Sequence, residues 1–241
     1  MKYTKKATKN KTTVYFYEDT HEYIDQDNVK YISVTTLIKK FFPEFNELEQ
    51  AKIQAERSCD SIEMILNYWK ARRENACEHG TNVHFACETY IKEKKILKFS
   101  KDKTNKCIKR AIKFIRKQNI GKIISVEKLL FDTQNKIAGQ CDLILRDGDT
   151  LIVGDWKTNE KISKEAFNGE VGIYPLQNYP NSDFYKYFIQ LNIYLYLILK
   201  NKHYPWAKNY KLMIFHIQED EVKTIPLEIN QNLIHELISQ K

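Results

Sequence analysis

Three charged residues in the second half of the chain have the types and spacing that phosphodiester chemistry needs. Asp142 lies in one mostly apolar stretch, and Asp155 and Lys157 lie in the next. Two carboxylates that converge repel each other unless a cation lies between them. Oxygen ligands of this kind suit Mg²⁺ or Mn²⁺, and a neighbouring lysine can hold a scissile phosphate or orient the attacking water. The set therefore indicates metal-dependent phosphodiester hydrolysis.

The strands that would position these residues are predicted to form a hairpin. Asp147-Gly148, between the two apolar stretches, is a strong signal for a two-residue turn. Alternation along both strands then puts Asp142, Asp155 and Lys157 on one face of the sheet. In this register Asp155 lies diagonal to Asp142, at roughly 7–8 Å between Cα atoms. The alternative is a solvated hairpin face, but charged residues inside otherwise buried strands need a reason.

The remaining pattern predicts an α/β sandwich with a mixed central sheet. GxGxxG and GxxxxGK[ST] motifs are absent from the sequence, so a nucleotide-binding fold has no support. Helical periodicity runs through residues 46–95 and is expected to break at His79-Gly80, and a long loop covers residues 159–182. The expected strands are 13–17, 22–25, 29–32, 123–131, 137–145, 150–156, 212–218 and 222–226, and the other expected helices are 34–42, 105–118, 183–200 and 230–239.

Composition limits the class of protein. The chain has 241 residues, of which 42% are hydrophobic, and a formal net charge of +8. Such a basic balance favours a polyanion partner, although a lysine-rich surface alone would also produce it. The five cysteines form no CxxC pair, so neither a disulfide framework nor a zinc knuckle is expected. The N-terminus lacks a secretory signal, and the longest apolar stretch, 188–199, is too short for a membrane span. We therefore expect an intracellular, cytoplasmic protein without a membrane partner.

Four ordered motifs resemble those of one nuclease family. Gly139-Gln-Cys-Asp142 followed by Asp155-Trp-Lys157-Thr158 resembles the GxxD…DxK[T] signature of the RecB-like branch of the PD-(D/E)xK nucleases. The similarity spans roughly residues 30–200, with an upstream HGTxxH helix at His79-Gly80-Thr81-Asn-Val-His84, a downstream QLxxY helix at Gln190-Leu191-Asn-Ile-Tyr194, and an SVT segment at Ser33-Val34-Thr35.

This resemblance implies a restriction-endonuclease-like core with a mixed central sheet flanked by helices and a helical N-terminal part. Residues 1–120 would carry the first strands and the HGTxxH helix. Residues 121–241 would form the nuclease core, and the two parts together would form one compact unit.

The same resemblance implies the metal ligands and the catalytic lysine. His84, Asp142 and Asp155 would bind the metal, with the Trp156 carbonyl as a fourth ligand, and Lys157 would be the catalytic lysine. Taken alone, His84 is also explained as a packed histidine. Its place after the Gly80-Thr81 pair favours the ligand.

Three further residues are candidates for supporting roles. Gln190 and Tyr194 would support the site and contact the phosphate backbone, and their i, i+4 spacing puts them on one helical face. Packing in the core is the alternative for both. Glu127 on the first strand of the core would be an extra acid, or an ordinary exposed strand charge.

The activity implied is that of a Mg²⁺- or Mn²⁺-dependent deoxyribonuclease, more specifically an exonuclease that processes DNA ends in replication, recombination or repair. The family members it suggests are phage-type exonucleases and the mitochondrial genome maintenance exonuclease group, so a phage- or virus-encoded protein acting in its host is one expectation. The alternatives are a structure-selective or restriction-like endonuclease and a DNA-binding module with a dead site. No cysteine follows Cys141, so no iron–sulfur cluster is expected. Helicase motifs are absent from the sequence, so any helicase or recombination partner would be a separate chain.

Two segments are expected to hold DNA. The helix 105–118 has an apolar stripe on one side and a basic face on the other, which binds phosphates or is merely solvated. The long loop offers aromatic side chains that can stack on unpaired bases. The basic residues are Lys106, Lys109, Arg110, Lys113 and Lys117, and the aromatic ones are Phe167, Tyr174 and Tyr179.

Overall fold

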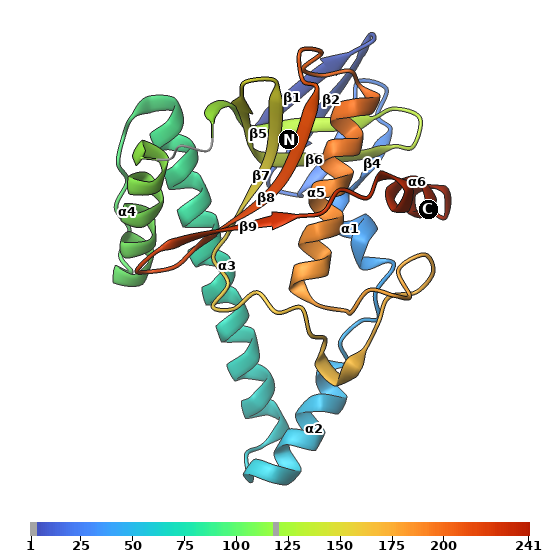
Figure 1. Cartoon of the computed structure of the whole chain (residues 1–241). Helices are drawn as coiled ribbons and strands as arrows, with labels where there is room; N and C mark the ends of the chain where they lie inside the picture. The colour runs from blue at the N-terminus through green and yellow to red at the C-terminus, as the bar shows by residue number, and fades with distance from the viewer. Residues whose placement is uncertain (1–3, 118–120) are drawn as a thin grey trace.

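The computed structural model describes residues 4–117 and 121–241, and within these ranges the chain folds around a nine-stranded sheet (Figure 1). The strands are β1 (Lys5–Lys9), β2 (Thr12–Tyr17), β3 (Glu22–Asp25), β4 (Lys30–Ser33), β5 (Lys122–Asp132), β6 (Ile137–Asp147), β7 (Thr150–Lys157), β8 (Asn209–Ile217) and β9 (Val222–Leu227). Their order is β1-β2-β3-β4-β6-β7-β8-β9, with β5 paired to β6. The β4–β6 and β7–β8 pairs are parallel and the others antiparallel, so the sheet is mixed, as expected.

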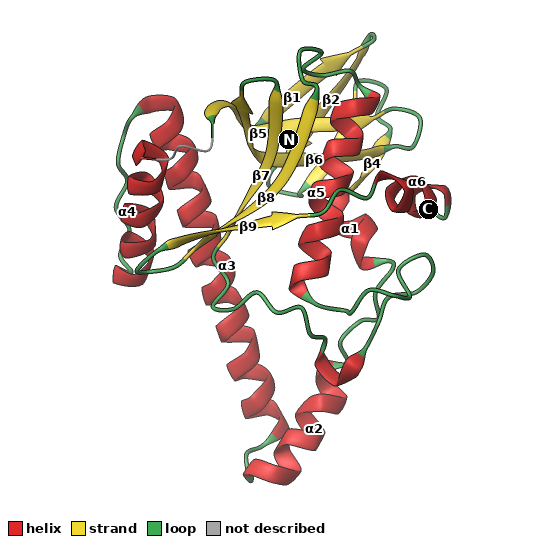
Figure 2. Ribbon diagram, viewed as in Figure 1, coloured by secondary structure: helices red, strands yellow, loops and turns green. Residues whose placement is uncertain are grey.

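Helices cover both faces of this sheet (Figure 2). α1 (Val34–Lys39), α5 (Asp183–Lys200) and α6 (Gln231–Ser239) share one core with Ile144 of β6. α3 (Ile62–Glu93) and α4 (Asp102–Lys117) share the other core with the neighbouring Leu143. Successive strand residues point to opposite faces, so the nearly unbroken apolar run of β6 fills both cores. The expected α/β fold with helices on both sides of the sheet is confirmed.

The β6–β7 hairpin is present, but its turn is one residue later than expected. Asp147 pairs with Thr150, so the turn begins at Gly148, whose φ of +60° suits glycine. The prediction that Asp147 itself belongs to the turn is wrong. The error shifts the pairing by two residues, which leaves every side chain on its predicted face. Continued by one pair, the observed register puts Asp142 directly opposite Asp155 instead of diagonal to it.

The predicted helix break at His79-Gly80 is also wrong, because α3 runs without interruption from Ile62 to Glu93. Ser61 starts this helix by accepting a hydrogen bond from the Met64 amide at 3.1 Å. A Cβ on Gly80 would lie 3.3 Å from the Thr158 hydroxyl oxygen. Glycine therefore marks a close contact between α3 and the segment that follows β7, where a helix end was expected.

The first half of α3 projects from the sheet together with α2 (Glu47–Ser58) in Figure 1. Most of the buried residues of α3 lie from His79 onward, and those packed on the sheet start at Val83. Leu48, Met64 and Tyr68 on the projecting part stay largely exposed. This arm is the helical N-terminal part that was expected.

Other boundaries deviate slightly from the expected ones. α4 starts at Asp102, before the expected residue 105, and the expected last residue, Gln118, lies outside the described residues. The proposed division after residue 120 also falls at the edge of the described part. The long loop 159–182 contains the short 3₁₀ helix η1 (Phe167–Gly169). Among the described residues, no helix is both long and apolar enough to cross a membrane.

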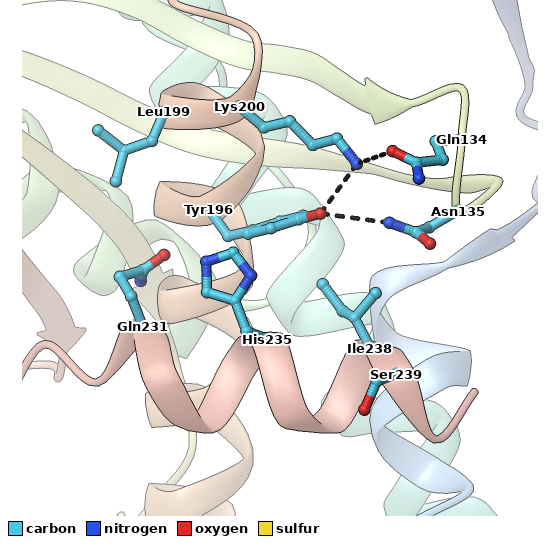
Figure 3. A pocket seen from close by; sticks show the side chains of 9 residues that line it. All are labelled: Gln134, Asn135, Tyr196, Leu199, Lys200, Gln231, His235, Ile238 and Ser239. Atoms are coloured by element: carbon cyan, nitrogen blue, oxygen red, sulfur yellow. Dashed lines mark hydrogen bonds between the residues drawn. The ribbon is translucent and has the colours of Figure 1, made fainter.

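A buried carboxylate ties the β5–β6 turn to the end of α5. Asp132 is 2% exposed and accepts hydrogen bonds from Lys200 Nζ at 2.7 Å and Tyr196 Oη at 3.1 Å. Figure 3 shows Lys200 and Tyr196 reaching Gln134 and Asn135 of the turn. Burial alone would raise the pKa of Asp132, but hydrogen bonds from Lys200 and Asn135 outweigh burial and hold the pKa below its ordinary value.

Asp132→Asn is expected to lower the free energy of unfolding by roughly 2 kcal/mol, because an amide cannot make the charge-assisted bond with Lys200. The native pKa is lowered, so the carboxylate's contribution is complete above its unfolded pKa, about 3.9, and disappears as pH falls through the native pKa. Urea unfolding at neutral and at acidic pH measures both effects. The exposed Asp220→Asn control should change stability by less than about 0.5 kcal/mol, and equal losses in the two variants would contradict the prediction.

Candidate metal centre

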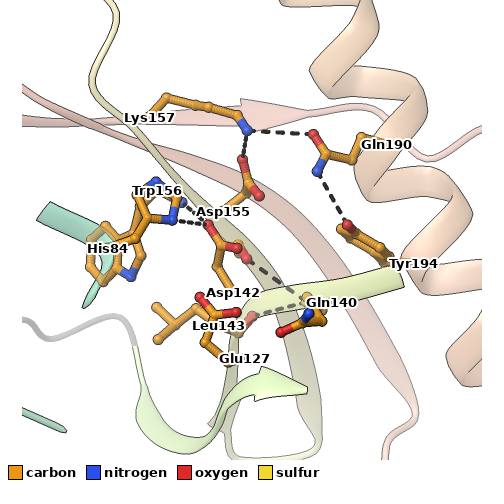
Figure 4. Close-up of polar contacts among 12 residues, drawn as sticks. His84, Glu127, Gln140, Asp142, Leu143, Asp155, Trp156, Lys157, Gln190 and Tyr194 are labelled. Atoms are coloured by element: carbon orange, nitrogen blue, oxygen red, sulfur yellow. Dashed lines mark hydrogen bonds and ion pairs between the residues drawn. The ribbon is translucent and has the colours of Figure 1, made fainter. Parts of the chain in front are cut away.

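Three carboxylates lie side by side on β5, β6 and β7 (Figure 4). The β5–β6 register on both sides of Glu127 puts it opposite Asp142, and the β6–β7 register puts Asp155 opposite Asp142 from the other side. Glu127 has a φ of +48°, a left-handed conformation that costs energy for a residue with a Cβ. The sheet thus aligns Glu127 with the two predicted acids, Asp142 and Asp155. The backbone at Glu127 is strained.

His84 reaches this row of acids from α3. Its Nδ1 lies 3.2 Å from Asp142 Oδ2, and the same oxygen accepts a hydrogen bond from the Trp156 amide at 3.0 Å. Three side chains each offer one ligand atom, and these atoms lie within 4.8 Å of one another: His84, Glu127 and Asp142. A single cation with metal–ligand distances of roughly 2.0–2.6 Å can bridge such a set.

Lys157 faces the same cluster from the end of β7. Its ammonium forms an ion pair with Asp155 Oδ2 and lies 3.4 Å from Gln190 Oε1. Gln190 in turn donates from Nε2 to Tyr194 Oη at 3.2 Å. The structure therefore brings Gln190 and Tyr194 of α5 to the lysine as one polar chain, with Gln190 as the link.

Burial and mutual repulsion change the pKa values of the acids in the cluster. Burial, followed by the charges of Asp155 and Glu127, raises the pKa of Asp142 well above its usual range. Burial also raises the pKa of Glu127, although Lys5 acts against it. Burial lowers the pKa of His84 to about 4 against the pull of Asp155, so its ring is neutral and able to bind a metal near pH 7. Buried acids that repel one another need a cation between them.

Burial and the neighbouring acids also act on Lys157. Burial would lower its pKa, but the charges of Asp155 and Asp142 outweigh burial and raise it above the ordinary value. Lys157 is therefore an ammonium near neutral pH. In this state Lys157 is a cation that can donate hydrogen bonds to a phosphate, and it cannot act as a base.

A cavity of about 530 Å³ gives access to the acids, and its walls include His84, Glu127, Asp142 and Tyr194. Gly139 forms part of the wall, and a Cβ there would lie 2.9 Å from both the Tyr194 ring and the Val34 side chain. The first residue of the GxxD motif is therefore a glycine because α1 and α5 both approach β6 at this point.

A family model described as PD-(D/E)XK nuclease superfamily matches residues 36–240, most of the chain. The chain belongs to the PD-(D/E)XK nuclease superfamily. No curated protein matches it. Among solved structures, it is similar to one titled "Crystal structure of SSO0001", with 15% sequence identity, a TM-score of 0.37, and coverage of 87% of this chain and 75% of that chain. That likeness is too low to support an argument, so membership rests on the family match.

The donor set of this PD-(D/E)XK chain fits a divalent metal ion. Two carboxylates and a neutral imidazole converge in His84, Glu127 and Asp142. Asp155 is 1% exposed, and its Oδ2 has the Lys157 ammonium as an ion-pair partner but no hydrogen bond of good geometry with any described residue. Glu127 thus lies with His84 and Asp142, and Asp155 lies beside them in contact with Lys157, where it stays a predicted ligand.

Two residues at this PD-(D/E)XK site were missed by sequence reasoning. Lys157 Nζ lies 4.2 Å from the centre of the Tyr187 ring, one turn before Gln190 on α5, so helical periodicity offered a signal. Lys5 of β1 offered none. Its ammonium contacts Glu127 Oε2 at 3.2 Å, Gln140 Oε1 at 2.8 Å and Glu88 Oε1 at 3.7 Å. Lys5 is therefore a built-in cation beside the candidate ligand Glu127.

Lys5→Met is expected to tighten Mn²⁺ binding by about tenfold, because it removes a positive charge that competes with the metal for Glu127. Calorimetric titration gives both the affinity and the number of ions bound. The matched control is Lys6→Met, since Lys6 is the exposed neighbour on the same strand. An affinity unchanged from wild type in the Lys5 variant would show that Lys5 does not compete with the ion.

Proposed function

We propose that this PD-(D/E)XK protein is a Mg²⁺- or Mn²⁺-dependent deoxyribonuclease of the RecB-like branch, and that it acts as an exonuclease on DNA ends. The observation that carries the proposal is the alignment of Glu127, Asp142 and Asp155 across three strands, with His84 and Lys157 on either side. This combination of buried acids, a neutral imidazole and one ammonium is what metal-assisted phosphodiester hydrolysis requires.

In this proposal His84, Asp142 and Asp155 hold the ion, Glu127 is the extra acid beside them, and Asp155 also pairs with Lys157. A bound divalent ion would supply polarisation of the scissile phosphate and activation of the attacking water. Trp156 has a supporting part, because its amide donates a hydrogen bond to Asp142 Oδ2 at 3.0 Å and so orients that carboxylate. Its carbonyl remains a proposed fourth ligand.

Lys157 is proposed to bind a non-bridging oxygen of the scissile phosphate. It is suited to this because Asp155, Gln190 and the face of the Tyr187 ring fix its ammonium in one place. A donor that is already oriented stabilises developing negative charge without reorganisation. Gln190 and Tyr194 are positioning residues in this scheme, since they reach the ammonium through one hydrogen-bonded chain.

The substrate is proposed to be DNA inside the cell, with ends produced by a separate helicase or recombination protein. Two of the three expected stacking residues, Phe167 and Tyr174, are more than half exposed. The third, Tyr179, is half-buried and stacks against Phe188 with ring centres 5.7 Å apart, so it packs against the core and offers bases less of its ring.

Digestion of matched linear and covalently closed DNA in Mg²⁺ tests the proposal. Loss of the linear DNA alone would support an exonuclease, and cleavage of both would support an endonuclease on the same site. The measurement should be repeated with EDTA, which should stop the reaction. Binding without cleavage of either substrate in Mg²⁺ and in Mn²⁺ would overturn the proposal in favour of a DNA-binding module.

A further inference from the structure

A second cavity, of about 760 Å³, lies between the middle of α3, the start of α4 and the segment after β7. Its walls carry five cationic side chains and one acidic side chain, Glu160. Such an excess of positive charge over a concave surface attracts anions. The cations are Arg72, Arg73, Lys101, Lys103 and Lys161.

This cavity adjoins the candidate metal centre. Thr158 on its wall directly follows Lys157, and His79 directly precedes Gly80, which lines the metal-centre cavity. Gly80 and Thr158 are close enough that a Cβ on the glycine would lie 3.3 Å from the threonine hydroxyl oxygen. The two cavities thus share one thin wall made by α3 and the end of β7.

His79 gives the cavity a buried ring nitrogen that has no partner in the described part of the chain. The side chain is 9% exposed, Nδ1 lies 2.9 Å from Thr104 Oγ1, and Nε2 has no hydrogen-bond partner among the described residues. In the tautomer in which the threonine hydroxyl donates to Nδ1, Nε2 carries the proton. A buried donor without an acceptor costs free energy, and an anion in this cavity would supply the acceptor.

The acids that now contact these cations are weak competitors. Glu160 Oε2 lies 3.3 Å from Arg72 Nη2 and Glu160 Oε1 lies 3.8 Å from Lys103 Nζ, while the glutamate side chain is 72% exposed. Lys101 contacts Glu78, whose side chain is 53% exposed. Exposed ion pairs contribute little to stability. A phosphate can therefore replace Glu160 as the partner of Arg72 and Lys103 at small cost.

We propose that this cavity binds a backbone phosphate of the nucleic-acid strand whose scissile phosphodiester lies at Lys157. The inference rests on the proposed function, because it assigns a second contact point to the same substrate. His79 and His84 are five positions apart on α3, which is a rise of about 7.5 Å along the helix, so one nucleic-acid strand can reach both cavities. The strand would leave the metal centre across the Gly80–Thr158 contact and enter the basic cavity.

The test measures binding of a short fluorescein-labelled single-stranded DNA by the full chain in Ca²⁺ over a series of KCl concentrations. Arg72→Gln with Lys103→Gln should weaken binding and reduce the slope of log affinity against log salt by about 0.7, the value for one lost phosphate contact on a single strand. His79→Leu should weaken binding about tenfold with an unchanged slope, because a neutral donor displaces no counterion. Melting temperatures show whether the buried substitution leaves the fold intact.

The matched control is Lys109→Gln with Lys113→Gln, which removes the same charge from the outer face of α4. These lysines border a different cavity that also contains Glu219 and Asp220. The slope of log affinity against log salt should therefore change less in this control variant. A wild-type slope for the Arg72 and Lys103 variant, or a larger loss for the control, would overturn the subsite. Cleavage by wild type in Mg²⁺ is scored separately, so failure of the subsite and failure of the nuclease assignment give different results.

Discussion

Asp142→Asn is expected to weaken Mn²⁺ binding by at least about 100-fold, because Asp142 is the acid that contacts both His84 and the row of carboxylates. Loss of a residue that only orients a ligand typically costs 10–100-fold in metal affinity, and loss of a ligand should cost no less. The asparagine oxygen can still accept the Trp156 amide, so the backbone geometry should persist. Calorimetric titration of Mn²⁺ into both proteins measures the difference.

The same substitution should increase the stability of the metal-free protein. Asp142 is repelled by Asp155 and Glu127 and desolvated by burial, which raises its pKa. Removing such a charge relieves repulsion, so the variant in EDTA should melt at a higher temperature than wild type, and Mn²⁺ should raise the melting temperature of wild type alone. Asp147→Asn, an exposed acid on the same strand, should alter neither quantity. Equal Mn²⁺ affinity in Asp142→Asn and wild type would remove this residue from the site.

Sequence reasoning reached the fold and most of this cluster because both depend on short-range patterns. Alternation within β6 and β7 put Asp142, Asp155 and Lys157 on one face, and that result survived a turn displaced by one residue because the shift in pairing was even. Helical spacing put Gln190 and Tyr194 on one side of α5, where they form one hydrogen-bonded chain to Lys157.

The features of the site that were not predicted depend on contacts between segments far apart in the sequence. Lys5 reaches Glu127 across 122 positions of sequence, and β1 itself is a lysine-rich strand with little apolar character. Gly80 looked like a helix end because glycine weakens helices, yet it is needed for contact with Thr158. The role of Glu127 depends on the β5–β6 register, which local sequence does not determine.

These long-range contacts give the site an arrangement different from the expected one. Glu127 was only an extra acid on sequence grounds, and Asp155 was a ligand. In the structure Glu127 lies with His84 and Asp142, while Asp155 pairs with Lys157. One acid of the pair predicted to bind the metal thus also contacts Lys157, the proposed catalytic lysine, and the expected effects of removing that lysine follow from this contact.

Lys157→Ala is expected to lower the rate of DNA cleavage by about 10²–10³-fold at saturating Mg²⁺, which corresponds to about 2.7–4 kcal/mol of transition-state stabilisation. The large effect is expected because the ammonium is fixed on three sides, by Asp155, Gln190 and the Tyr187 ring, and its side chain is only 15% exposed. Single-turnover cleavage of linear DNA gives the rate. DNA binding in Ca²⁺ should stay close to wild type, and Mn²⁺ binding should become no weaker, because the removed ammonium is, like that of Lys5, a positive charge beside the acids.

A lysine that served only to neutralise Asp155 would behave differently. In either case Lys157→Ala leaves the buried Asp155 carboxylate without its ion-pair partner, which lowers stability. If Lys157 only neutralised Asp155, Lys157→Arg would also restore activity, because it restores the charge. If Lys157 contacts the phosphate, the cleavage rate depends on the exact place of its ammonium. The arginine variant should then regain stability but little of the cleavage rate. Cleavage by Lys157→Ala at the wild-type rate would show that Lys157 plays no part in the chemistry, and the proposed nuclease mechanism would then have to be abandoned.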